Sequence, residues 1–254
     1  MYQIHKSLGQ HFLQDENISR KIIQALMFQP GEAVLEVGPG LGALTKYLIA
    51  LPEIEYRAIE IDKEKILYLL RRYPELEGSL LQGDVLEMAL PFSRPFKLIG
   101  NFPYQITSGI MFRIMEWKAH MQLAVGMVQK EVAQRICSSP GQKTYGLLSV
   151  LLQTWFQIEY LFEVSPNCFF PPPRVQSAVI RLMPKPEHPL ITDEKQYIQL
   201  VKTAFQQRRK MLRNALKEFF PPEQLQHPVF NQRAEQLGWA DYLQLYEWYR
   251  HVNP

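Results

Sequence analysis

The sequence predicts an α/β protein in which a mostly parallel sheet is followed by a small all-helical C-terminal domain. Two observations predict this fold class. From about residue 17 to residue 130, short apolar segments alternate with segments whose apolar residues recur at helical spacing. Past Pro189, every remaining segment has the helical spacing. Strands that alternate with helices along a chain form parallel sheets covered by helices on both faces.

The expected elements alternate along the first part of the chain. Helices are expected at 17–28, 41–50, 62–73 and 107–117, and strands at 33–37, 56–61, 79–84, 97–101 and 121–129. Beyond residue 130 the alternation loosens, with helices expected at 131–136 and 145–156 and strands at 158–164 and 175–183. These two late strands are expected to form an antiparallel edge of the sheet. The most continuous of the last helical segments covers 193–220.

Prolines mark the expected domain boundary. They gather at 171–173 and again at 184–189, where the second cluster directly precedes the last helical segments. Two domains are therefore expected, at 1–186 and 187–254.

Composition and charge limit the possible functions. The 254 residues are 46% hydrophobic and 21% charged, as in a packed globular protein, and the net charge of +3 argues only weakly for an anionic partner. Two cysteines, Cys137 and Cys168, are too few for a disulfide framework, and neither has a partner at metal-ligand spacing. No segment has the length of a membrane span or the apolar core of a signal peptide. A cytoplasmic protein without a metal ion or a membrane partner is expected.

Glycines follow the first strand in EVGPGLGALT, at 36–45. At a turn from strand to helix, glycines let backbone N–H groups approach a ligand at the positive end of the helix. Gly38, Gly40 and Ala43 match the dinucleotide-binding fingerprint loosely. The turn is therefore consistent with a nicotinamide or flavin cofactor, with S-adenosylmethionine, or with a tight turn that binds no ligand.

Carboxylates end the next two strands. Glu60 ends the second strand, where a carboxylate can accept hydrogen bonds from both hydroxyls of a ribose. Asp84 ends the third strand, where it can accept a hydrogen bond from an adenine amino group. Either acid alone is also consistent with a strand-end cap or a surface charge. Together they predict a nucleoside-binding crevice at the carboxyl edge of the sheet, the usual ligand position in open α/β folds.

The fourth strand ends in Asn101-Phe102-Pro103-Tyr104, at the same edge. An amine conjugated to an aromatic ring is a poor nucleophile because its lone pair is delocalised. The Asn101 side-chain carbonyl and a backbone carbonyl at Phe102 or Pro103 can hold the two N–H bonds of such an amine. Tyr104 can stack on the base to which it belongs. The alternative is a structural loop, but with the upstream acids the motif favours methylation of a base amine.

These motifs resemble those of the bacterial KsgA-type small-subunit rRNA adenine dimethyltransferases. The likeness begins with HKSLGQHFLQD at 5–15, includes the glycine turn and NFPY, and continues to FFPPPRVQSAVIRL at 169–182 and QRRKMLRNAL at 207–216. Phe102 replaces the more frequent leucine of the family, and His11 stands where asparagine is common. The resemblance implies a Rossmann-like class I S-adenosylmethionine-dependent methyltransferase fold, with a catalytic domain at 1–186 and a helical RNA-binding domain at 187–254.

The resemblance implies that two sets of residues form the site. The first set binds the methyl donor and consists of His11, Leu13, Gly38, Glu60, Asp84 and Asn101. The second set holds the target base: Asn101 contacts the nitrogen, and Tyr104 and Phe170 lie on opposite faces of the ring. The adjacent Phe169 is an alternative to Phe170, and packing before the prolines is a structural alternative for both.

Basic residues cluster near the C-terminal end of the chain, with no acid among them: Arg208, Arg209, Lys210, Arg213 and Lys217. On a helix, residues 209, 213 and 217 share one face and can contact successive phosphates, an interaction that weakens in salt. A solvated helix face is the ordinary alternative. The resemblance implies an RNA-binding surface.

The resemblance implies transfer of methyl groups from S-adenosylmethionine to N6 of two adjacent adenosines in the 3′-terminal hairpin of small-subunit (16S) rRNA. The expected enzyme is a monomer that acts on an immature 30S-type particle during late assembly. The alternatives are a large-subunit rRNA adenine methylase of the antibiotic-resistance type, a non-catalytic ribosome assembly factor and a nicotinamide-dependent oxidoreductase. The N-terminal arm (HKSLGQHFLQD, 5–15) and the motifs at 169–182 and 207–216 disfavour the large-subunit methylase. Intact NFPY, Glu60 and Asp84 disfavour a loss of catalysis. Measurements of cofactor binding separate the third.

Overall fold

A computed structural model of the chain describes residues 11–187 and 189–252, which group into two compact units. Within the described residues, the first unit contains 11–133 and 159–184, and the second contains 134–158 together with the chain from 185 onward. The predicted domain boundary between residues 186 and 187 stays a prediction. The two compact units differ from the predicted domains mainly because residues 134–158 group with the C-terminal segment. The HKSLGQ part of the N-terminal motif lies outside the described residues.

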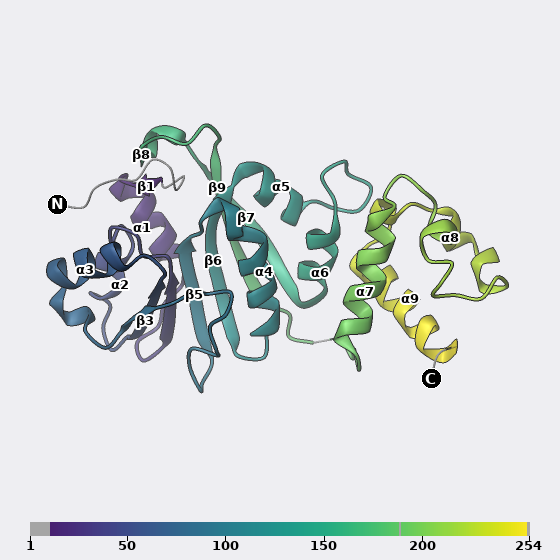
Figure 1. Cartoon of the computed structure of the whole chain (residues 1–254), viewed down its shortest axis with the longest axis horizontal. Coiled ribbons are helices and arrows are strands. Elements are labelled where there is room, and N and C mark those ends of the chain that lie inside the picture. Colours follow the sequence, from purple (N-terminus) through teal and green to yellow (C-terminus); the bar gives the residue numbers. More distant parts are fainter. Residues whose placement is uncertain (1–10, 188, 253–254) are drawn as a thin grey trace. The chain divides into compact units, whose positions relative to one another are not determined.

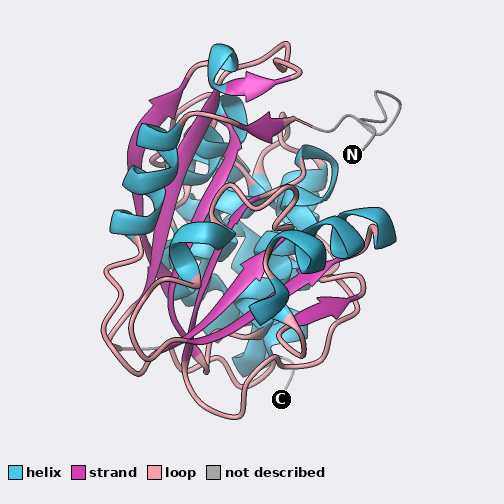
Figure 2. Ribbon diagram, turned by 90° about the vertical axis from the view of Figure 1, so that its left-hand side faces the viewer, coloured by secondary structure: helices cyan, strands magenta, loops and turns pink. Residues whose placement is uncertain are grey.

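A seven-stranded sheet has the strand order β4-β3-β2-β5-β6-β9-β7. Figure 2 shows the strands of the protein in magenta and its helices in cyan. Its strands are β2 (Ala33–Val37), β3 (Glu55–Glu60), β4 (Leu80–Gln82), β5 (Phe96–Asn101), β6 (Met121–Gln129), β7 (Phe156–Val164) and β9 (Ser177–Pro184). The pairs from β4 to β6 are parallel, whereas β9 is antiparallel to β6. The prediction of a mostly parallel sheet with an antiparallel late strand is therefore confirmed.

Helices cover both faces of the sheet in the first unit (Figure 1). They are α1 (Glu16–Ala25), α2 (Thr45–Leu48), α3 (Lys63–Arg72) and α4 (Thr107–Glu116). The first three share one apolar core with one face of the sheet, where Ile22, Leu48 and Leu69 pack in the same cluster as Val34 and Ile99. α4 contacts β6 on the opposite face.

Backbone conformation makes α2 shorter than the sequence predicts. A helix was expected over 41–50, whereas α2 begins only at Thr45. Gly38, Gly40 and Gly42 adopt φ values of 67°, 59° and 89°, a left-handed region that ends regular helix and favours glycine. The chain therefore forms an extended turn before the helix starts.

A separate two-stranded sheet joins the N-terminal arm to the FFPPP segment. β1 (Phe12–Leu13) pairs antiparallel with β8 (Phe169–Phe170). In this register Phe12 lies opposite Phe170, and Leu13 lies opposite Phe169. The sequence did not predict this pairing, because each strand has only two residues and the partners are far apart in the chain.

A buried aromatic ring supports the loop that follows β5. The Phe102 side chain is 1% exposed, and its ring lies against Gly100 of β5 and Gly126 of β6. A Cβ atom at Gly100 would lie 2.9 Å from the ring, and one at Gly126 would lie closer still. The two glycines therefore provide the space for phenylalanine at a position where the resembled family more often has leucine.

The second unit contains helices, and no strand occurs at 185–187 or 189–252. Its helices are α6 (Leu147–Trp155), α7 (Glu194–Gln206), α8 (Leu212–Ala215) and α9 (Trp239–Val252), while α5 (Lys130–Cys137) begins in the first unit. Edge-to-face contacts of Trp155 with Tyr197, and of Tyr197 with Tyr246, form part of its core. The predicted helical C-terminal region is confirmed. None of the helices within 11–187 and 189–252 has the length and apolar character needed to cross a membrane.

The prediction of one long helix over 193–220 is wrong. α7 ends at Gln206, and α8 begins at Leu212. Between them, Met211 is extended (φ −66°, ψ 150°) and forms a β-bridge with Arg233, while the Leu212 backbone N–H donates to the Gln232 carbonyl over 2.8 Å. This pairing with a distant segment breaks the helix although the apolar spacing continues through it.

We predict that Gly126→Ala lowers the free energy of unfolding by about 1–3 kcal/mol, because the added methyl group overlaps the Phe102 ring. In the Gly126→Ala/Phe102→Leu double variant, a smaller side chain relieves this overlap. Urea unfolding of the parent, both single variants and the double variant measures the effect. A double variant no more stable than Gly126→Ala alone would show that the ring is not the constraint.

Candidate active site

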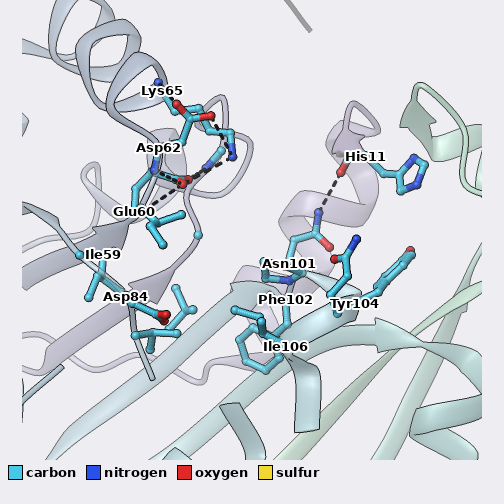
Figure 3. Close-up of a pocket in the computed structure, with 18 of the residues that line it drawn as sticks. His11, Ile59, Glu60, Asp62, Lys65, Asp84, Asn101, Phe102, Tyr104 and Ile106 are labelled. Carbon is cyan, nitrogen blue, oxygen red and sulfur yellow. Dashed lines mark hydrogen bonds and ion pairs between the residues drawn. The ribbon is translucent and has the colours of Figure 1, made fainter. Parts of the chain in front are cut away.

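Four neighbouring strands present functional groups at one edge of the sheet. β4, β3, β2 and β5 are adjacent and parallel, so their carboxyl ends share that edge. Asp84 follows β4, Glu60 ends β3, Gly38 follows β2 and Asn101 ends β5. All four line one cavity of about 500 Å³ (Figure 3). The structure thus brings together residues that the sequence places up to 63 positions apart, from 38 to 101.

The other predicted site residues of this unit lie around the same cavity at different distances. His11 and Tyr104 line it. Leu13 is buried and lines a smaller cavity of about 250 Å³, which shares Gly38 and Asn101 with the first. Phe170 lines neither, and its side chain is 53% exposed, whereas Phe169 is 4% exposed. Phe170 is therefore the ring of this pair that is accessible to a ligand.

Glu60 is almost fully buried, and its two carboxylate oxygens are unequally occupied. Oε1 accepts from the backbone N–H groups of Ile61 and Asp62, each over 3.1 Å, and lies 3.5 Å from Nζ of Lys65. Oε2 accepts only from the Gly40 backbone N–H, over 3.4 Å, among the hydrogen bonds of the described residues. The oxygen with capacity for a ligand hydroxyl is therefore Oε2.

Asp84 has a similar division between its oxygens. Oδ1 accepts from the Leu86 backbone N–H over 2.8 Å, which fixes the carboxylate at the end of the strand. Within 11–187 and 189–252, Oδ2 accepts no hydrogen bond. Apolar side chains of Ile59, Val85 and Ile106 line the cavity around these acids. A flat base with an edge amino group fits such surroundings, because its faces are apolar and its edge donates.

The side-chain amide of Asn101 has a defined orientation. Its Nδ2 donates to the backbone carbonyl of His11 over 3.3 Å (Figure 3). Because a carbonyl can only accept, the nitrogen must face the N-terminal arm. Oδ1 is consequently left as an acceptor next to the cavity that Asn101 lines. This is the atom that the sequence predicts to hold a target N–H.

The backbone of the NFPY loop distinguishes between the two carbonyls that the sequence left as alternatives. The Pro103 carbonyl already accepts from the Ile106 backbone N–H over 3.1 Å and from Thr107 Oγ1 over 3.2 Å. The Phe102 carbonyl accepts no hydrogen bond from the chain that the structure describes, although its N–H donates to Met127. Phe102 is therefore the better candidate for a second acceptor beside Asn101.

The ring of Tyr104 is held through its hydroxyl group. The Tyr104 hydroxyl lies 2.7 Å from Oγ of Ser177, a fully buried residue at the start of β9. Burial also raises the pKa of the Tyr104 phenol, so the hydroxyl keeps its proton at neutral pH. The contact ties the NFPY loop to the VQSAVIRL segment.

His11 connects the arm to the polyproline segment. Its Nδ1 lies 2.8 Å from the Pro171 carbonyl, so this nitrogen carries a hydrogen and donates. The His11 and Tyr104 rings are 6.0 Å apart between centroids. Backbone and side-chain atoms of His11 therefore connect the arm to two segments around the site, the NFPY loop and the FFPPP segment.

A buried carboxyl group lies beneath the glycine turn. Glu36, which is 1% exposed, accepts from Thr45 Oγ1 over 2.8 Å and from the Tyr56 hydroxyl over 2.5 Å. Burial is the main cause that raises the pKa of Glu36 to about 7, and the negative charge of Glu60 adds to it. The group connects β2, β3 and α2 behind the cavity.

The predicted basic cluster lies in the second unit, on a turn rather than on one helix face. The expectation that residues 209, 213 and 217 share a helix is wrong, because α7 and α8 are separate and only Arg213 of the three lies in α8. Arg208 donates to the Lys143 carbonyl over 2.6 Å and lies 3.7 Å from Glu235. The remaining members, Arg209, Lys210, Arg213 and Lys217, are exposed.

Several residues at the site were not singled out by the sequence analysis. Phe12 and Lys65 line the larger cavity, Glu36 lines the smaller one and Ser177 holds Tyr104. Glu36 and Ser177 fall inside motifs that were recognised, but their roles depend on long-range contacts. Lys65 had a local signal, since a cation in the first turn of a helix opposes the helix dipole. Within 11–187 and 189–252, no group of three or more His, Cys, Asp and Glu side chains is placed to hold a metal ion.

The cavity and its edge define the class of protein. A parallel sheet with a buried carboxylate at the end of β3, a partly buried one after β4, and an oriented amide at the end of β5 is the arrangement of a Rossmann-like, class I S-adenosylmethionine-dependent methyltransferase. The acceptor oxygens of the two carboxylates and the apolar walls described above fit the ribose and adenine of S-adenosylmethionine. When bound, S-adenosylmethionine supplies an electrophilic methyl group on a sulfonium.

The chain belongs to the ribosomal RNA adenine dimethylase family, whose model matches residues 1–251. It is 46% identical to a ribosomal RNA small subunit methyltransferase A of Flavobacterium johnsoniae over 94% of this chain and 93% of that one. It is also 46% identical to the protein of the same name in Porphyromonas gingivalis, over 94% and 95% of the two chains.

Solved structures show the same relationship. A dimethyladenosine transferase from Plasmodium falciparum superposes with a TM-score of 0.82 at 25% identity, over 95% of this chain and 98% of that one. The 23S rRNA methyltransferase ErmE superposes with a TM-score of 0.67 at 27% identity, over 92% and 98%.

We predict that Glu36→Gln changes how stability depends on pH. The folded-state pKa of Glu36 is raised from 4.5 to about 7, so the protonated carboxyl stabilises the fold at low pH. That contribution is lost as pH rises through 7. Relative to the parent, Glu36→Gln should therefore gain on the order of 2 kcal/mol of unfolding free energy between pH 5 and pH 8.5.

Urea unfolding of both proteins at several pH values measures this gain. Glu75→Gln, which removes an exposed carboxyl group, is the matched control. A difference between Glu36→Gln and the parent that stays constant from pH 5 to pH 8.5 would contradict the prediction.

Proposed function

We propose that this protein transfers methyl groups from S-adenosylmethionine to N6 of two adjacent adenosines in the 3′-terminal hairpin of 16S rRNA. The products are N6,N6-dimethyladenosines. The substrate is an immature 30S-type particle in the cytoplasm during late assembly of the small subunit, and the enzyme acts as a monomer. The observation that carries the proposal is Asn101, whose amide nitrogen is engaged by the arm and whose oxygen remains an acceptor beside the nucleoside cavity.

The donor-binding roles follow from the free acceptor atoms. Glu60 Oε2 accepts from the ribose, and Asp84 Oδ2 accepts from the adenine amino group. Gly38 contacts the amino-acid end, because its positive φ and missing Cβ leave the backbone accessible. His11 and Leu13 close over the donor mainly through backbone groups. The pairing of β1 with β8 holds this part of the arm in place.

The NFPY loop activates the target amine. Asn101 Oδ1 and the Phe102 carbonyl accept from its two N–H bonds, which favours a pyramidal nitrogen with a localised lone pair. The lone pair forms the new N–C bond as the C–S bond breaks. The nitrogen then releases one proton to water, so no strong general base is required. In the second round only one N–H remains, and one of the two acceptors loses its partner.

Aromatic side chains hold the base. Tyr104, fixed by Ser177, stacks on one face, and Phe170 covers the other. The exposure of Phe170 and the burial of Phe169 support this choice between the two rings. Stacking on an aromatic side chain contributes on the order of 1–3 kcal/mol per base.

Exposed basic residues bind the rRNA backbone. Arg209, Lys210, Arg213 and Lys217 are exposed, and no acidic residue lies between Arg208 and Lys217. A turn lets them contact phosphates in more than one direction. Arg208 contributes less to RNA binding because its guanidinium is already engaged with Lys143 and Glu235.

The decisive test incubates the protein with labelled S-adenosylmethionine and undermethylated small subunits, and then maps the modified nucleotides. Two dimethylated adjacent adenosines in the terminal hairpin are expected. In a parallel reaction with large subunits, label at a single adenine would favour the antibiotic-resistance type of methylase. Particle binding without label would favour an assembly factor. The greater sequence similarity to small-subunit methyltransferases than to ErmE supports the first outcome.

We predict that Asn101→Ala lowers the methylation rate by at least about 100-fold, because it removes an acceptor at the reacting nitrogen. Binding to the particle should change little. Asn231→Ala, which removes an exposed amide in the second unit, is the matched control. Methylation by Asn101→Ala at the parent rate would eliminate the assigned role.

We predict that Arg209→Ala/Arg213→Ala weakens particle binding and flattens its salt dependence. Loss of two phosphate contacts should reduce the slope of log K against log salt by about two. The control is Lys195→Ala/Arg250→Ala, which removes the same charge from exposed positions outside the cluster. Equal slopes for the cluster variant and the parent would remove this surface from the proposal.

A further inference from the structure

A lysine ammonium group lies inside the predicted nucleoside cavity. Lys65 lines the cavity, and its side chain is only 11% exposed. Its Nζ is 3.5 Å from Glu60 Oε1 and 3.8 Å from Asp62 Oδ2, and it lies 6.0 Å from the centroid of the Phe12 ring. Figure 3 shows the side chain bending from α3 toward both carboxylates.

The position of Lys65 in α3 does not favour a cation. It is in the first turn, after the cap formed by Asp62, whose Oδ1 accepts from the backbone N–H groups of Glu64 and Lys65. The N-terminal end of a helix carries partial positive charge, which repels an ammonium group. The helix end therefore does not stabilise the Lys65 ammonium, whereas its contacts with the two carboxylates do.

The hydrogen-bond distribution at Glu60 indicates what Lys65 adds. Glu60 Oε1 is filled by two backbone N–H groups and the ammonium, so only Oε2 remains as an acceptor for a ligand. A vicinal diol has two hydroxyls, each of which can donate once and accept. One free carboxylate oxygen satisfies the donor of one hydroxyl well. The second hydroxyl needs a donor, and an ammonium group has three N–H bonds.

We propose that Lys65 donates a hydrogen bond to one hydroxyl of the methyl donor's ribose, while Glu60 accepts from the other. Lys65 is then a second ribose-binding residue alongside Glu60, and the pair recognises the diol through an acceptor on one side and a donor on the other. This inference rests on the proposed use of S-adenosylmethionine.

The test measures binding of S-adenosylhomocysteine and of its 2′-deoxy and 3′-deoxy analogues by calorimetry. Lys65→Met keeps an unbranched side chain that ends at Cε and removes the ammonium. Lys63→Met removes an equal charge from an exposed position in the same turn of α3 and is the matched control. Thermal melting establishes that each variant is folded.

Lys65→Met should bind S-adenosylhomocysteine roughly tenfold more weakly than the parent, as expected for a lost charged hydrogen bond. For one of the two deoxy analogues, Lys65→Met and the parent should bind equally, because the hydroxyl that Lys65 contacts is absent. Lys63→Met should match the parent throughout.

If Lys65→Met binds all three ligands more weakly than the parent by the same factor, the inference is overturned. Lys65 would then act only through Glu60. Unchanged binding of S-adenosylhomocysteine by Lys65→Met would overturn it as well. Failure of the folded parent to bind S-adenosylhomocysteine would contradict the proposed function and this inference with it, so the two failures are distinguishable.

Discussion

The parallel pairing of β4, β3, β2 and β5 is the constraint on which the site depends. Parallel strands end at a common edge, so residues that follow each strand meet there regardless of their separation in the sequence. The register is equally important, because a shift of one residue turns every side chain to the other face. Pairing of Val37 with Ile59 and of Glu60 with Gln82 sets both acids and the glycine turn at the same height.

Two buried carboxylates at this edge have different surroundings and therefore different chemistry. Glu60 accepts from the backbone N–H groups of Ile61 and Asp62 and lies 3.5 Å from the Lys65 ammonium. Glu36 accepts from the hydroxyls of Thr45 and Tyr56, and burial raises its pKa. The same residue type thus serves as an acceptor in one place and as a support for the glycine turn in the other.

The side chains of the NFPY loop are fixed by contacts from outside the loop. The arm backbone orients the amide of Asn101, β9 holds the hydroxyl of Tyr104 through Ser177, and glycines of β5 and β6 receive the Phe102 ring. A loop held from three directions loses little conformational freedom when a substrate binds, so more of the binding free energy remains for catalysis. The FFPPP segment is linked to the same network because it pairs with the arm.

The sequence by itself determined the alternation of strands and helices, the parallel sheet, and the positions of Gly38, Glu60, Asp84 and Asn101 at its carboxyl edge. Those features depend on local apolar spacing and on the rule that parallel strands end together. Only the tertiary structure decided which oxygen of each acid is free, which way the Asn101 amide faces, and that Lys65 enters the cavity. It also broke the helix expected over 193–220, because pairing of Met211 with Arg233 outweighs local helical spacing. Such contacts join residues far apart in the chain, and no local pattern of spacing contains them.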